Sequence, residues 1–290
     1  MRALSLFSGV GGFELGMQRA GIETVMQVEQ DKHCLAVLER HWPDVERITD
    51  VRNVGVGRSA DHTQGKPIAA ERSISNAESR WEDVDLVYGG FPCQDLSVAG
   101  KRAGFGGERS SLWYEFHRVL SELRPRWALI ENVPGLLSSN SGHVFGILLS
   151  GLDELGYNAS WAILDAQHFG VPQRRRRVFI VASPRGRGAE QVLSVCERCD
   201  GDTQAGQPAE QKSAFTLTAG VRSTGVRRLT PRECERLMGW PDDHTRYAAD
   251  GTEISDGNRY KQCGNGVVSP VAEWIGHRLV AVDKLLGATT

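Results

Sequence analysis

Residues 3–12 read Ala-Leu-Ser-Leu-Phe-Ser-Gly-Val-Gly-Gly, an apolar run that leads directly into a glycine-rich turn. The run has the length of a buried strand, and a helix is expected after the turn. Glycines at such a turn allow a tight bend and expose backbone N–H groups to an anionic group of a ligand. Glu29 ends the next apolar run, where an acid commonly accepts hydrogen bonds from ribose hydroxyls. Together these features indicate a cofactor that contains adenosine, with an ordinary glycine turn and a surface acid as the alternative.

Apolar runs and helix-like stretches alternate along the first part of the chain, and no internal repeat is visible. A last helix is expected to start at Ser269 as its N-cap, with Pro270 in the first turn. This order predicts an α/β fold whose ligands bind at the carboxyl ends of the strands. Buried strands are predicted at 3–7, 25–29, 86–88, 127–130 and 178–182, and helices at 32–42, 110–123 and 143–155.

The composition is that of an enzyme-sized globular protein. The 290 residues are 40% hydrophobic, and no run approaches the roughly 20 apolar residues of a membrane helix. The start of the chain lacks a secretory pattern, so we expect a cytoplasmic protein with reduced thiols. Cys196 and Cys199 have no second closely spaced pair to join them, so no metal site is expected. The net charge of -2 leaves room for a local basic face.

Residues 89–97 read Gly-Gly-Phe-Pro-Cys-Gln-Asp-Leu-Ser and follow a predicted strand directly. Cys93 therefore lies at the carboxyl end of a strand, which is an active-site position in this class of fold. The two glycines permit close approach of a ligand, and Pro92 fixes one backbone dihedral. A thiolate at Cys93 would be a nucleophile where nearby positive charge lowers its pKa. The usual alternative is a small buried hydrophobic side chain, and the glycine and proline context disfavours it.

A second set of chemically active side chains lies at the ends of later predicted strands. Glu131 and Asn132 follow the strand at 127–130, so a carboxylate would lie beside Cys93 if the two strands are neighbours. Four arginines at 174–177 lead into the strand at 178–182, and alternation sends two of them toward the site. A solvated charge run is the ordinary alternative for such a cluster.

With these residues assembled, the chain closely resembles the DNA cytosine-5 methyltransferases of the short bacterial or phage type, in motif order over nearly its whole length. The resemblance implies a Rossmann-like fold that uses S-adenosylmethionine, with a small, mostly irregular or β target-recognition lobe. Residues 262–268 resemble the segment that folds back to close the cofactor pocket. The implied cofactor contacts are Phe7, Gly9, Val10, Gly11, Gly12, Glu29, Gln30, Asp50, Val51, Asn265, Gly266 and Val267.

The same resemblance assigns the catalytic residues. Cys93 is the implied nucleophile, Glu131 the group at cytosine N3, and Arg175 and Arg177 the arginines that frame the base. Pro92 and Asn132 complete the implied catalytic set. One residue departs from the family pattern, since Gln30 stands where many relatives carry an aromatic side chain that stacks on adenine.

The DNA side of the molecule is predicted from residues 97–111, where glycines and positive charges are combined as a lid on the DNA backbone would require. An ordinary flexible loop is the alternative. DNA contacts are expected from Gln94, Ser97, Lys101, Arg102 and Arg109. The expected domains are a catalytic and cofactor-binding domain at 1–182 with a polar insertion at 52–82, a small target-recognition region at 183–227, and a return to the catalytic domain at 228–290.

The expected reaction is methylation of carbon 5 of cytosine in double-stranded DNA. The Cys93 thiolate would add to carbon 6 of a base flipped out of the duplex, which makes carbon 5 nucleophilic. A monomer is expected, and functional pairing with a restriction endonuclease is left open. Three alternatives remain at this point: a tRNA cytosine-5 methyltransferase of the same fold, a non-catalytic DNA-binding relative, and a dinucleotide-dependent oxidoreductase that shares the glycine turn.

Overall fold

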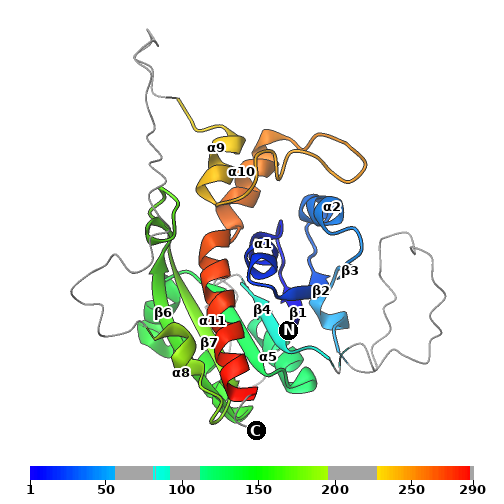
Figure 1. The fold of residues 1–290 in the computed structure, drawn as a ribbon. Helices are drawn as coiled ribbons and strands as arrows, with labels where there is room; N and C mark the ends of the chain where they lie inside the picture. Colours follow the sequence, from blue (N-terminus) through cyan, green and yellow to red (C-terminus); the bar gives the residue numbers. More distant parts are fainter. Residues whose placement is uncertain (56–80, 82, 92–111, 195–226, 288–290) are drawn as a thin grey trace, which may run out of the picture.

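The computed structural model describes residues 1–55, 81, 83–91, 112–194 and 227–287, which form one mixed sheet with helices on both faces (Figure 1). The sheet order is β3-β2-β1-β4-β5-β7-β6. The strands are β1 (Arg2–Leu6), β2 (Glu23–Val28), β3 (Glu46–Ile48), β4 (Leu86–Gly89), β5 (Trp127–Asn132), β6 (Tyr157–Asp165) and β7 (Arg176–Pro184). Strands β1 to β5 are parallel to one another, whereas β7 is antiparallel to β5 and β6. The carboxyl ends of β1 to β5 therefore meet at one edge of the sheet.

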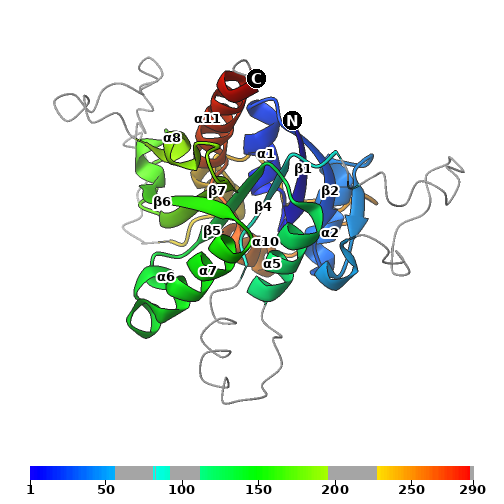
Figure 2. The same cartoon turned by 90° about the horizontal axis from the view of Figure 1, so that it is seen from below.

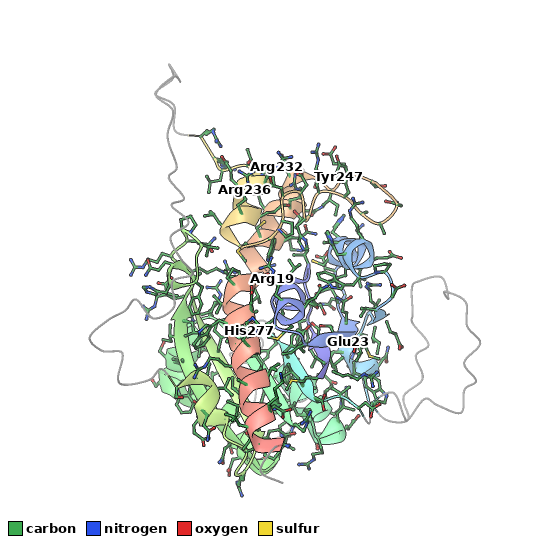
Figure 3. All side chains as sticks on the ribbon, viewed as in Figure 1. Arg19, Glu23, Arg232, Arg236, Tyr247 and His277 are labelled. Carbon is green, nitrogen blue, oxygen red and sulfur yellow. The ribbon has the colours of Figure 1, made fainter. Side chains whose placement is uncertain are left out.

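The helices cover the two faces of this sheet and one of its ends. They are α1 (Gly12–Arg19), α2 (Lys32–His41), α5 (Leu112–Leu123), α6 (Gly135–Ser138), α7 (His143–Glu154), α8 (Ala189–Leu193), α9 (Pro231–Leu237), α10 (Asp256–Asn265) and α11 (Ser269–Gly287). Figure 2 shows α1, α8 and α11 on one side of the sheet and α5 and α7 on the other. Arg232 and Arg236 mark α9 at the end of the molecule where α10 also lies (Figure 3). Within the described parts of the chain, none of the helices combines the length and apolarity that a membrane crossing needs.

Alternation along the central strands fills both layers of the core. In β1, Ala3 packs in the layer of α1 and α11, whereas Leu4 packs in the layer of α5 and α7. In β5, Leu129 and Ile130 divide in the same way. All four side chains are fully buried. Burial on both faces is typical of parallel sheets, and it explains why these strands are unbroken apolar runs in the sequence.

The predicted α/β architecture is confirmed, with small shifts at the ends of its elements. Strands β3 and β6 were not predicted. Strand β3 has only three residues, and Trp161 and Ile163 of β6 are exposed at the edge of the sheet and leave no continuous apolar run. The last helix begins at Ser269 as expected, but its hydroxyl donates a hydrogen bond to the carbonyl oxygen of Gly12 (2.7 Å). Ser269 therefore ties α11 to the glycine turn.

Residues 183–194, which we expected in the target-recognition region, pack against the layer of α1 and α11 instead. Strand β7 runs to Pro184, and α8 buries Val192 in the layer of α1 and α11. Arg278 of α11 donates hydrogen bonds to carbonyl oxygens at the end of α8. The rest of the predicted target-recognition region, residues 195–226, lies outside the described part of the chain, so its role stays a prediction.

Candidate active site

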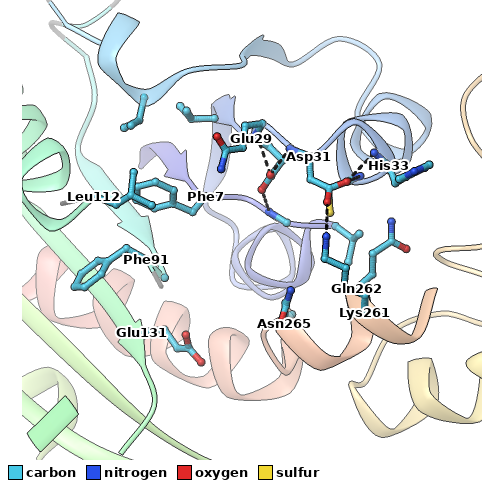
Figure 4. Close-up of a pocket in the computed structure, with 18 of the residues that line it drawn as sticks. Phe7, Glu29, Asp31, His33, Phe91, Leu112, Glu131, Lys261, Gln262 and Asn265 are labelled. Carbon is cyan, nitrogen blue, oxygen red and sulfur yellow. Dashed lines mark hydrogen bonds and ion pairs between the residues drawn. The ribbon is translucent and has the colours of Figure 1, made fainter. Parts of the chain in front are cut away.

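A pocket with a volume of about 810 Å³ opens at the carboxyl ends of β1, β2, β4 and β5 (Figure 4). Its walls come from segments far apart in the sequence, including the glycine turn, the start of α2 and the carboxyl end of α10. In Figure 4, Glu29 and Glu131 lie on different sides of this pocket. The predicted site residues that line it are Phe7, Gly9, Val10, Glu29, Gln30, Asp50, Val51, Glu131, Asn132, Arg177, Asn265 and Gly266.

The glycine turn forms one wall and is held by contacts that only glycine permits. Gly9 has a φ of 58°, in the left-handed region that favours glycine. A Cβ on Gly12 would lie 2.4 Å from the carbonyl oxygen of Val267, so glycine at this position lets the last part of the pocket wall pack directly on the turn. Gly11 packs against Trp42, and neither Gly11 nor Gly12 lines the pocket. The structure therefore places Gly11, Gly12 and Val267 behind the pocket surface, as its support.

The carboxylate of Glu29, directly after β2, is a hydrogen-bond acceptor in the pocket wall. Its Oε1 accepts hydrogen bonds from the N–H groups of Gln30 and Asp31 (2.9 and 2.8 Å), and its Oε2 accepts one from Gly9 (2.8 Å). Burial raises the pKa of Glu29, although these three N–H groups act to lower it. The carboxylate is thus fixed in the pocket wall with acceptor capacity left for hydroxyl groups of a ligand.

Asp50 and Val51 bring the chain after β3 to the same pocket. Val51 is buried and supplies an apolar surface. Asp50 forms an ion pair with Arg52, with 2.6 Å between Oδ2 and Nη2. Any ligand amine that meets Asp50 would therefore share this carboxylate with a guanidinium group.

Another wall of the pocket is formed by residues 262–268, which we call the closing segment. Gln262 lines the pocket and is only 5% exposed, yet neither atom of its amide has a hydrogen-bond partner among the described residues. A buried amide without partners is costly unless a ligand supplies them. The acceptor Glu29, the apolar Val51 and the unpaired amide of Gln262 together fit a ligand with ribose hydroxyls and a heterocyclic base.

The second acidic position is Glu131, at the end of β5. Its Oε1 lies 3.0 Å from Nε of Arg177, which enters the pocket from β7. Burial raises the pKa of Glu131 to about 7, against the lowering effect of Arg177 and Arg175. A buried carboxyl with a pKa near neutrality can both hold and release a proton at ordinary pH, as a general acid or base must.

Arg175 does not line the pocket. Its Nη2 donates hydrogen bonds to the carbonyl oxygens of Gly264 and Gly266 (both 2.8 Å), so it holds the closing segment. Burial, and then the neighbouring charge of Arg177, lower the pKa of Arg175 to about 10. Of the two predicted arginines, Arg177 is thus the one at the pocket surface.

Asn132 ties β5 to the segment that leads to Cys93. Its Nδ2 donates to the carbonyl oxygen of Phe91 (2.9 Å), and its Oδ1 accepts from the N–H of Val133. A Cβ on Gly90 would lie 2.8 Å from Oε2 of Glu131. Strands β4 and β5 are parallel neighbours, as the sequence analysis required, so the chain enters its Pro-Cys-Gln segment directly beside the Glu131 carboxylate.

Several predicted residues lie outside the described residues, and their roles stay predictions. They are Pro92, Cys93, Gln94, Ser97, Lys101, Arg102 and Arg109, together with Cys196 and Cys199.

Sequence reasoning missed part of the pocket wall. Asp31 and Lys261 both line it and form an ion pair with 2.9 Å between Oδ2 and Nζ (Figure 4). This pair joins the start of α2 to the end of α10. Asp31 also caps α2, accepting from the N–H groups of His33 and Cys34, and this N-cap pattern was the one signal that could have identified it. Nothing in the sequence indicated that Lys261 would meet it.

Comparison with known proteins gives one consistent result. The family profile described as C-5 cytosine-specific DNA methylase matches residues 1–195 and 196–281. The Type II methyltransferase M2.BsuMI of Bacillus subtilis (strain 168) is 32% identical, over 96% of this chain and 75% of its own length. The Type II methyltransferase M.HhaI of Haemophilus parahaemolyticus is 26% identical, over 96% of this chain and 94% of its own. Among solved structures, the S. pombe Dnmt2 methyltransferase has the same fold, with a TM-score of 0.65, 16% identity and 99% coverage of both chains.

Proposed function

Because the chain belongs to the C-5 cytosine-specific DNA methylase family, it is a DNA cytosine-5 methyltransferase, and we propose that Cys93 and Glu131 act on a cytosine extruded from duplex DNA, with S-adenosylmethionine as methyl donor. One observation carries the residue assignment. The buried Glu131 carboxyl lies against Gly90, at the entry to the Pro-Cys-Gln segment, and shares its pocket with the glycine turn and Glu29. A methyl transfer must bring the reacting base and the methyl donor together. Glu131 and the Pro-Cys-Gln segment would hold the base, and the glycine turn and Glu29 would hold the donor.

The residues of the pocket fit S-adenosylmethionine. Glu29 would accept hydrogen bonds from the ribose hydroxyls, and Val51 would lie against the adenine. Gln262 would gain the partners that its buried amide lacks. The bound cofactor would supply an electrophilic methyl group. Gln30 lines this part of the pocket without an aromatic face, so stacking on the adenine would contribute little here.

The protein's own groups carry the remaining chemistry. The Cys93 thiolate would form a bond to carbon 6 of the cytosine, which breaks the double bond between carbons 5 and 6. The electron pair of that bond would shift through the ring toward N3, where Glu131 would supply a proton. The pKa of Glu131, raised by burial to about 7, suits that proton transfer. Arg177, paired with Glu131, would hold the carboxyl in place as charge builds on the base. Loss of the carbon 5 proton to a base, elimination of Cys93 as a thiolate and return of the N3 proton to Glu131 would then restore the aromatic ring and the starting state of the site.

Access to the base requires that it leave the stack, since carbons 5 and 6 are covered in a duplex. We therefore keep double-stranded DNA as the proposed partner and residues 97–111 as the proposed lid on its backbone. The relatives named as Type II methyltransferases also support a functional pairing with a restriction endonuclease. We also propose that the protein is a monomer and that it acts in the cytoplasm.

A side-by-side assay tests the choice of substrate. Purified protein and S-adenosylmethionine would be incubated with duplex DNA and, separately, with tRNA, and the nucleosides would be analysed by mass spectrometry. We expect 5-methylcytosine in the DNA and none in the tRNA. Preference for tRNA would overturn the DNA assignment, and methylation of neither, without measurable cofactor binding, would favour a non-catalytic DNA-binding protein.

A further inference from the structure

The turn at residues 239–245, between α9 and α10, contacts the pocket wall from behind at two places. Figure 1 shows the chain between these helices reaching across to α2. Trp240 and His244 are both buried in this turn, with 5.4 Å between their ring centroids. Neither side chain lines the pocket, and the reaction proposed above uses neither of them.

His244 holds the glycine turn. Its Nε2 lies 2.7 Å from the carbonyl oxygen of Val10, which lines the pocket. A carbonyl oxygen can only accept, so Nε2 carries the hydrogen and donates it. The ring is 1% exposed and stacks on His41, with 4.2 Å between centroids, and His41 Nε2 is 2.8 Å from the carbonyl oxygen of His244. Burial, and then the neighbouring His41, lower the pKa of His244 to about 3, so this donor stays neutral at ordinary pH.

Trp240 holds the closing segment. Its Nε1 donates to the carbonyl oxygen of Val267 (3.2 Å). Its ring also fills the space beside Gly266, where a Cβ would lie 2.5 Å from two indole carbons. Gly266 lines the pocket, so the position of the indole decides where this part of the wall lies.

One buried carboxylate fixes the direction of the turn. Glu235 Oε2 accepts from the N–H of Asp243 (2.8 Å), and Oε1 accepts from the N–H of Thr245 (2.9 Å). These are the two residues that flank His244. Arg259 lies 3.1 Å from Oε1 and offsets the charge of Glu235, whose side chain is fully buried. The turn is therefore held by side chains of α9 and α10.

We propose that Trp240 and His244 are positioning residues for the cofactor: His244 sets the glycine turn through Val10, and Trp240 sets the closing segment through Val267 and Gly266. This inference rests on the proposed function, because it takes the pocket to bind S-adenosylmethionine. One short turn thereby aligns the first and last parts of the chain around the same ligand.

The first test replaces the His244 donor. His244→Phe keeps an aromatic ring but leaves the Val10 carbonyl without its partner, so we expect the Kd and KM for S-adenosylmethionine to rise on the order of 10-fold, with kcat within about two-fold. His244→Gln retains a donor and should recover most of that loss. His277→Phe, exposed on α11, is the matched control (Figure 3). Calorimetry with S-adenosylmethionine, steady-state kinetics and urea unfolding without ligand supply the readouts.

The second test uses the contact between Gly266 and Trp240. Gly266→Ala pushes a methyl group into the indole and should weaken S-adenosylmethionine binding on the order of 10-fold. Trp240→Phe makes room for that methyl group, so the double variant should bind more tightly than Gly266→Ala alone. Such rescue is a departure from additivity that residues in contact show. A methyl group that simply blocked the ligand would not be rescued.

The outcomes separate the two proposals. Wild-type Kd values in His244→Phe, or additive losses in the double variant, would overturn the positioning roles while leaving the proposed function intact. Lower unfolding midpoints with unchanged Kd values would do the same, because they would show a structural role alone. Failure of the wild-type protein to bind S-adenosylmethionine would overturn the proposed function, and the positioning roles with it.

Discussion

Cys93→Ala is expected to abolish methyl transfer to duplex DNA, with a loss on the order of 10⁴-fold or more, as removal of a nucleophile commonly causes. Without the thiolate no bond forms at carbon 6, and carbon 5 of an intact cytosine ring is too weak a nucleophile to accept a methyl group. Binding of S-adenosylmethionine and DNA should stay within about two-fold, since neither depends on the covalent step. Tritiated methyl transfer, calorimetry and a DNA mobility-shift assay measure the three quantities.

Cys234→Ala is the matched control for this variant. Cys234 is a half-buried free cysteine of α9 that lies outside the pocket lining, and burial raises its pKa, which makes it a poor nucleophile. Its replacement should leave methyl transfer unchanged. Turnover by Cys93→Ala at a rate near that of the wild type would refute covalent catalysis.

Glu131→Gln is expected to lower kcat/KM on the order of 10²–10⁴-fold, the usual contribution of a general acid or base. Glutamine keeps the size of the side chain but cannot give a proton to cytosine N3. Because Glu29 and the closing segment are unchanged, the Kd for S-adenosylmethionine should stay near the wild-type value. Activity within a few-fold of the wild type would contradict the assignment of Glu131.

The same variant should change how stability depends on pH. Burial raises the pKa of Glu131 in the folded protein to about 7, so the folded state holds this proton more tightly than the unfolded chain does. The stabilisation that the protonated Glu131 carboxyl gives the folded state is therefore fully present below about pH 4 and is lost as the pH rises to about 7. Urea unfolding should show that the free energy of unfolding falls less from pH 5 to pH 8 for Glu131→Gln than for the wild type. Glu23→Gln, at an exposed position, is the control and should behave as the wild type.

The sequence was sufficient for the parts of the fold that bury both faces of a strand. Ala3 and Leu4 point to opposite layers, and so do Leu129 and Ile130, and each such run is apolar throughout. Strand β6 was missed because an edge strand that exposes Trp161 carries no such pattern. Its antiparallel pairing with β7 depends on chain direction, which local sequence does not specify.

The candidate site was predictable where its residues lie at strand ends. Glu29 and Glu131 follow apolar runs and were found on that basis. The resemblance also placed Asn265 and Gly266 at the pocket, and both line it. The ion pair between Lys261 and Asp31 was not predictable, because it depends on how the folded chain brings α10 to the start of α2. Arg175 shows a further limit: the resemblance assigned it to the base, but its guanidinium group donates hydrogen bonds to carbonyl oxygens of the closing segment.

The central claim is that Cys93, Glu131 and the methyl donor converge on one extruded cytosine. A duplex that carries 5-fluorocytosine tests it most directly, because fluorine at carbon 5 cannot leave as a proton and the elimination of Cys93 is blocked. With S-adenosylmethionine present, we expect a protein–DNA adduct that survives denaturation and that peptide mass spectrometry assigns to Cys93. No adduct under conditions in which the unsubstituted duplex is methylated, or an adduct at another cysteine, would contradict the account.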